Sequence, residues 1–121
     1  MVTERLSPTV SAMTEDDVRR LALALPEATE EPHFDAASFR VRSRIFASLP
    51  AGGGIVEILV TGPDVKEAIA EQPGSCQELL SGRKLLGVRV RLAEADPVLV
   101  KELLSLAWRR RAPQRLSSQW D

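Results

Sequence analysis

Residues 37–49 read ASFRVRSRIFASL, and this stretch decides the fold. Side chains along a strand alternate between two faces, so Phe39 and Val41 fall on one side while Arg40 and Arg42 fall on the other. An apolar run resumes after the charged turn and suits a second strand that pairs back on the first. The stretch therefore predicts a β-hairpin with one buried face and one basic face.

Residues 87–92, GVRVRL, repeat the same alternation later in the chain. Val88 and Val90 are expected to point inward and Arg89 and Arg91 outward. If both stretches belong to one antiparallel sheet with its apolar face on the helices, four arginines lie on the opposite face, and whether they cluster depends on the strand order. They are Arg40, Arg42, Arg89 and Arg91.

Three helices are expected around this sheet. Thr14 followed by Asp17 resembles a capping box and opens the first helix, which Pro26 ends. Residues 61–64, TGPD, open a short second helix after a strand. Asp96 followed by proline opens a long last helix.

Residues 27–35 are interpreted as an acidic connector that contains the only histidine of the chain. His33 lies near Glu30, Glu31 and Asp35, so a general base or a ligand cluster is one interpretation. A single histidine with no cysteine or second histidine nearby makes a poor metal site, and no nucleophile motif accompanies it. The favoured alternative is a histidine that caps or hydrogen-bonds at the entry of the hairpin.

The glycine run 52–54 suggests a phosphate-binding loop. That motif needs a lysine followed by serine or threonine and then opens a helix, whereas here a strand is expected over residues 55–60. A hairpin turn is therefore predicted.

Residues 75–86 give no clear pattern, although residues 81–84, SGRK, form a basic turn that either contacts phosphate or remains solvated. Cys76 is the only cysteine, so neither an internal disulfide nor a zinc site is expected.

Length and composition suit one domain. The chain has 121 residues, of which 44% are hydrophobic and 27% charged, so it can bury one core and is not a disordered chain. No apolar run reaches the roughly 20 residues of a membrane span, and the first residues lack the pattern of a secretory signal. We expect a cytoplasmic protein without membrane contact, with a flexible extension over residues 1–12, a domain over 13–113 and a tail over 114–121.

The net charge of −1 argues against a strongly basic nucleic-acid binder, but the charges are unevenly distributed. Residues 1–37 carry five more acidic than basic side chains, and the remainder carries four more basic than acidic ones. One face can therefore be basic while another is acidic.

The densest basic cluster is Arg109–Arg111 with Arg115, at the end of the last helix beside Trp108, a predicted core residue. Cations are favoured at the negative end of a helix dipole, which explains the cluster structurally. A functional role is the alternative, although consecutive helical residues point in different directions and dilute a single patch.

The order of these parts resembles the MmcQ/YjbR family of small bacterial proteins: a helix ending in Leu-Pro, then EPHF at residues 31–34, then FRVRSRIFA at residues 39–47. The resemblance covers about residues 13–113. It implies a compact α+β domain with a CyaY-like (frataxin-like) layout, and a role in DNA binding. It also leads us to expect an aromatic residue, commonly tryptophan, at about Leu86 or Gly87, and this chain has none there.

The predicted architecture is a single α+β domain in which an antiparallel sheet of about four strands packs on N- and C-terminal helices. The predicted function is non-enzymatic binding of double-stranded DNA through phosphate contacts, by a monomer or a weak homodimer. An alternative is a protein- or small-ligand-binding domain that uses the same arginines for an acidic partner. No catalytic residue, metal or cofactor is expected. The predicted DNA-binding residues are Arg40, Arg42, Arg44, Arg83, Lys84, Arg89 and Arg91.

Overall fold

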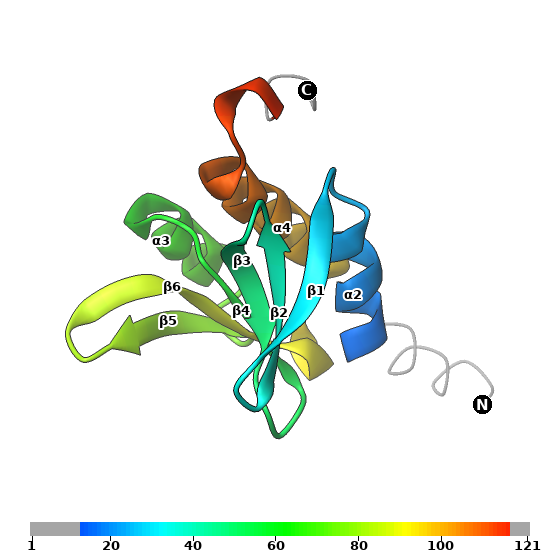
Figure 1. Cartoon of the computed structure of the whole chain (residues 1–121). Coiled ribbons are helices and arrows are strands. Elements are labelled where there is room, and N and C mark those ends of the chain that lie inside the picture. The colour runs from blue at the N-terminus through cyan, green and yellow to red at the C-terminus, as the bar shows by residue number, and fades with distance from the viewer. Residues whose placement is uncertain (1–12, 117–121) are drawn as a thin grey trace.

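Six strands form one sheet in the order β1-β2-β3-β4-β6-β5, and every neighbouring pair is antiparallel (Figure 1). The computed structural model describes residues 13–116; the extension predicted over 1–12 and residues 117–121 of the tail predicted over 114–121 lie outside them. The strands are β1 (Ala28–His33), β2 (Ala36–Val41), β3 (Arg44–Leu49), β4 (Ile55–Ile58), β5 (Cys76–Ser81) and β6 (Lys84–Arg91).

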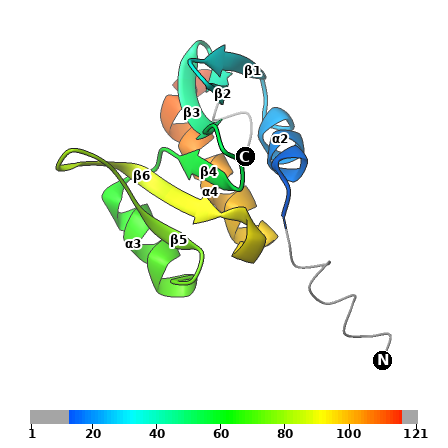
Figure 2. The same ribbon diagram turned by 90° about the horizontal axis from the view of Figure 1, so that it is seen from below.

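Within residues 13–116, three α-helices pack on this sheet: α2 (Glu15–Leu23), α3 (Gly62–Glu71) and α4 (Pro97–Arg111). α4 packs on β3 and β4 and against α2, whereas α3 packs on the β5–β6 hairpin. Figure 2 separates the two regions, with α2 beside β1 and α3 beside β5. The predicted α+β architecture, with an antiparallel sheet on N- and C-terminal helices, is confirmed. The sheet has six strands rather than about four.

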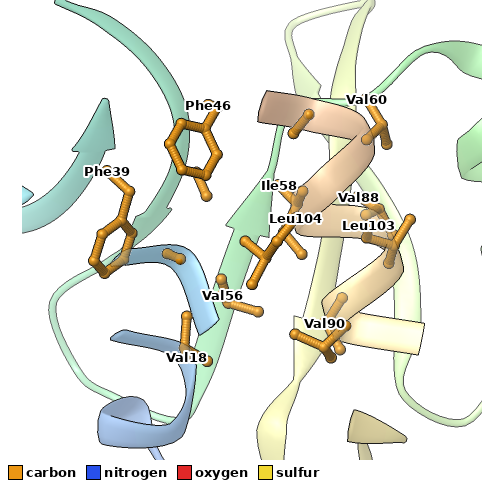
Figure 3. Close-up of a cluster of buried hydrophobic side chains, with 14 of the residues drawn as sticks. Val18, Phe39, Phe46, Val56, Ile58, Val60, Val88, Val90, Leu103 and Leu104 are labelled. Atoms are coloured by element: carbon orange, nitrogen blue, oxygen red, sulfur yellow. The ribbon is translucent and has the colours of Figure 1, made fainter. Parts of the chain in front are cut away.

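Side chains from α2, β2, β3, β4, β6 and α4 meet in one core (Figure 3). Val18, Phe39 and Phe46 are fully buried there, each burial contributing roughly 1.5–3 kcal/mol relative to exposure. Trp108 is also fully buried, as predicted, and its indole Nε1 donates a hydrogen bond to the Pro26 carbonyl over 2.9 Å. That bond satisfies the one polar atom of the buried indole.

The predicted capping box at the start of α2 is present. Thr14 Oγ1 accepts from the Asp17 backbone N–H at 3.1 Å, and Asp17 Oδ2 accepts from the Thr14 N–H at 2.9 Å. The helix ends at Leu23, three residues before Pro26. Asp96 likewise caps α4 by accepting from the Val98 N–H.

The β2–β3 hairpin is confirmed. Arg42 and Ser43 both have positive φ, 51° and 70°, which is typical of the tight two-residue turns that match strand twist. The glycine run predicted as a turn also joins two antiparallel strands, β3 and β4, and all three glycines have positive φ. No helix begins there, so this loop lacks the layout of a phosphate-binding loop.

The interpretation of residues 27–35 as a connector is wrong. Ala28–His33 form β1, which pairs along its whole length with β2. Five of its six residues are exposed, because β1 is an edge strand with little contact to the core. Its proline and glutamates are residues that protect an edge from further pairing.

Residues 75–86 also form strands that the sequence did not predict. Cys76–Ser81 form β5, the other edge of the sheet, and β6 begins at Lys84 rather than at residue 87. The SGRK turn connects them, with Gly82 at φ 60°. Cys76 is free and buried; burial raises the pKa of its thiol, as for a small hydrophobic residue in a packed site.

The surroundings of Gly87 explain why an aromatic residue is absent from this one of the two positions, 86 and 87, where it was expected. A Cβ at residue 87 would lie 2.1 Å from the Ile58 carbonyl oxygen and 2.9 Å from the Leu59 Cα. The backbones of β4 and β6 therefore approach too closely for any side chain there.

Candidate nucleic-acid interface

The outer face of the sheet, opposite the core, carries a polar row across all six strands. Partners in an antiparallel ladder point to the same face, so the strand registers place these side chains side by side. The row runs Glu31, Ser38, Ser48, Glu57, Arg89 and Gln77.

The predicted sheet-face arginines do lie outward, but each lies beside a glutamate. Arg89 Nε is 3.8 Å from Glu57 Oε2 in the neighbouring strand. Arg40 Nε is 3.9 Å from Glu31 Oε1 and donates a hydrogen bond to Ser38 Oγ at 3.0 Å. The outer face is therefore a paired surface rather than an uncompensated basic one.

The two predicted arginines at strand ends are paired as well. Arg42 forms two hydrogen bonds with the Glu27 carboxylate. This contact lowers the pKa of Glu27 and raises the pKa of Arg42. Arg91 Nε is 3.1 Å from Glu94 Oε1. Both pairs are exposed, and exposed pairs contribute about 0–1 kcal/mol, but they still cancel the charge that a phosphate would meet.

The remaining three predicted residues have no ion pair within residues 13–116. Arg83 and Lys84 are exposed at the β5–β6 turn, and Arg44 is exposed just after the β2–β3 turn. Both turns lie at the same end of the antiparallel strands. In Figure 1 the β2–β3 turn lies at the top and the β5–β6 hairpin extends to the left, so the two turns form separate basic tips.

The end of α4 adds arginines that the prediction treated mainly as dipole partners. Arg44 Nη1 donates to the Arg111 carbonyl oxygen at 3.4 Å, which joins the β2–β3 turn to the helix end. Arg110 Nη1 donates to the Leu59 carbonyl oxygen at 2.8 Å. We call Arg44, Arg110 and Arg111 the arginine end. The strand order brings Arg44 to the helix, so no local sequence pattern could have revealed this grouping.

Burial lowers the pKa of Arg111, and the neighbouring positive charges of Arg110 and Arg44 lower it further. Arg111 Nε is buried and has no hydrogen-bond partner among the described residues. Arg111 is thus a partly buried cation, and the charges that act on its pKa are those of two other arginines.

Acidic residues gather at the opposite end of the strands. Glu15, Glu30, Glu31 and Asp35 help to line a hollow of about 630 Å³ beside the β1–β2 turn. Arg19 also lines it, and its Nε lies 3.0 Å from Glu30 Oε2. Within residues 13–116, no group of histidine, cysteine or acidic side chains is arranged to hold a metal ion.

His33 ends β1 and is exposed, with its ring centroid 4.8 Å from that of Phe34 in an edge-to-face arrangement. Phe34 is 93% exposed at the tip of the turn. Within residues 13–116 the His33 side chain makes this ring contact and no hydrogen bond, so the cap or hydrogen bond predicted for it at the hairpin entry is not seen.

The fold and the surface define a class: a small α+β domain with one antiparallel sheet backed by helices, and basic groups at one end of its strands. The family model described as YjbR matches residues 23–110, and the chain belongs to the YjbR family. The chain is also similar to the crystal structure of Deinococcus radiodurans protein DR2400, which carries a DUF419 family-model domain. That likeness has a TM-score of 0.69 at 23% identity and covers 81% of this chain and 78% of that one, so it supports the fold. No curated protein matches the chain. No helix in residues 13–116 is long and apolar enough to cross a membrane.

Proposed function

We propose that the protein is a non-enzymatic binder of double-stranded DNA that contacts phosphates through its basic tips. The observation that carries the proposal is the division of the seven predicted residues: Arg44, Arg83 and Lys84 are exposed without an ion pair in the described chain, whereas the other four lie beside glutamates. Unpaired exposed cations can replace the counterions of a DNA strand, which is the main source of non-specific affinity.

The β5–β6 turn is the part of this surface that best fits the proposal. Arg83 and Lys84 are adjacent at the end of a hairpin that extends from the body of the protein (Figure 1). Such contacts would position the protein on the duplex without reading its sequence.

The test is fluorescence anisotropy of a labelled duplex of about 25 base pairs, titrated at several salt concentrations. Arg83→Gln with Lys84→Gln should weaken binding and reduce the slope of log affinity against log salt by about two, because each lost phosphate contact removes about one. Lys66→Gln with Lys101→Gln removes the same charge from exposed positions on α3 and α4 and serves as the matched control. The proposal fails if the wild-type chain does not bind, or if both double variants lose the same affinity.

A second candidate is a domain that binds an acidic protein partner or a small anionic ligand through the same arginines. The net charge of −1 favours it, because a weakly charged protein gains little from long-range attraction to DNA. Absence of duplex binding at low salt, with capture of an acidic partner that persists at high salt, would favour this candidate over the first.

A further inference from the structure

The arginine end joins two segments that are far apart in the chain. Arg44 follows the β2–β3 turn, whereas Arg110 and Arg111 end α4, and the bond from Arg44 Nη1 to the Arg111 carbonyl links them. The bond from Arg110 to the Leu59 carbonyl fixes the second guanidinium against the segment after β4. Two of the three guanidinium groups are therefore bound to backbone carbonyls at strand and helix ends, and the charges of both act on Arg111.

The positive charge at this place is not compensated by the residues described. None of the three arginines has a carboxylate partner within residues 13–116, and the Glu27 carboxylate is engaged with Arg42. A helix dipole presents only about half an elementary negative charge at its C-terminus. That is too little to balance three guanidinium groups, of which one is partly buried.

The described residues of the protein also use few of the N–H donors of the three groups. One hydrogen bond is made by the side chain of Arg44, one by that of Arg110, and none within residues 13–116 by that of Arg111, although a guanidinium carries several N–H donors in a planar fork. This fork matches the oxygens of a phosphate in a bidentate manner. Neighbouring arginines without a carboxylate partner therefore suit the recognition of a phosphate group.

We propose that Arg44, Arg110 and Arg111 form a binding site for a phosphate group. A phosphate relieves the repulsion between the three cations and fills their free donors. If the phosphate belongs to a DNA strand, the site deepens the proposed function and rests on it; if it belongs to a small phosphorylated ligand, the site stands alone. Two of the three residues lie outside the set predicted from the sequence.

The first test needs no DNA. Thermal unfolding of the full chain is measured in sodium phosphate and in sodium chloride at equal ionic strength. At phosphate concentrations about ten times the dissociation constant, the Tm should rise by roughly 4–8 °C relative to chloride. Arg44→Gln and Arg110→Gln should each abolish that rise, and both positions are exposed, so the variants should fold. Arg20→Gln, an exposed arginine on α2, should retain it.

If the Tm of the wild-type chain shows no phosphate-specific rise, or if all variants show an equal rise, the proposed site is wrong.

Anisotropy with a duplex that lacks terminal phosphates then identifies the source of the phosphate. Weaker duplex binding by Arg44→Gln and Arg110→Gln than by Arg20→Gln supports a backbone phosphate. Unchanged duplex binding with a lost phosphate rise supports a small ligand. A retained phosphate rise in a chain that binds no duplex leaves the site in place and rejects the proposed DNA-binding function.

Discussion

Arg89 lies directly opposite Glu57 in the β4–β6 ladder, with Arg89 Nε 3.8 Å from Glu57 Oε2. The sequence places Arg89 on the outer face through the alternation of residues 87–92, but it does not show that a carboxylate stands beside it. The pairing exists because β6 adds to the sheet next to β4, a strand some thirty residues earlier. The positive charge predicted for β6 at Arg89 is thus compensated by a glutamate of the neighbouring strand.

The sheet-face arginines should therefore contribute little to DNA binding. We expect Arg40→Gln with Arg89→Gln to change duplex affinity less than twofold and to leave the salt slope unaltered, because each side chain lies beside Glu31 or Glu57. Anisotropy at matched salt, compared with the Arg83→Gln and Lys84→Gln variant, provides the measurement. A loss of duplex affinity as large as that of the β5–β6 turn variant would indicate that the sheet face contacts DNA.

The capping box of α2 predicts a pH-dependent stability. The hydrogen bond from the Thr14 backbone N–H, followed by that from the Thr14 side chain, lowers the pKa of Asp17 below its usual value. A carboxyl whose pKa is lower in the folded state stabilises the fold above its unfolded pKa, and this stabilisation disappears as the pH falls through the folded pKa. We therefore expect Asp17→Asn to lower the Tm at pH 7 and the difference from wild type to vanish in acid.

The matched control for this prediction is Asp16→Asn. Asp16 precedes Asp17 in the same first turn and its side chain is 80% exposed, but it makes no cap. Its replacement should change the Tm little at any pH. Thr14→Ala should cost about 1 kcal/mol, the usual value of an N-cap. Equal pH profiles for the Asp16 and Asp17 variants would contradict the assignment of the cap.

How far the fold could be predicted depends on how each strand is buried. The side chains of β2 and β6 alternate between core and surface, and the apolar and polar residues of 37–49 and 87–92 follow this alternation. β1 and β5 are the edges of the sheet, and most of their residues are exposed on both faces. Exposed edge strands need no alternation of apolar and polar residues, so the sequence carries no period to recognise.

The candidate site was predictable only in part, for a different physical reason. Arg83 and Lys84 belong to a turn, and turns are exposed wherever they lie in the fold. Whether Arg40 or Arg89 has a glutamate beside it depends on which strand is its neighbour in the sheet. The arginine end depends on the contact between Arg44 and the end of α4, sixty-seven residues apart in sequence. Neither relationship is encoded in a local pattern.

Gly87 makes the sharpest prediction about stability. A methyl group at residue 87 would lie 2.1 Å from the Ile58 carbonyl oxygen, a backbone atom that cannot move without disturbing the β4–β6 ladder. Gly87→Ala should therefore lower the free energy of unfolding by about 1–3 kcal/mol or more, as overpacking does. Urea unfolding followed by circular dichroism provides the measurement.

Gly74→Ala is the matched control, because a Cβ at residue 74 would meet no heavy atom within 4 Å and this glycine does not have a positive φ. Its effect should stay within about 0.5 kcal/mol, as for most surface substitutions. If Gly87→Ala were as stable as Gly74→Ala, the backbones of β4 and β6 would have to lie further apart than this structure places them. The same result would leave room for a side chain at residue 87 within β6, one of the two positions where the family resemblance led us to expect an aromatic residue.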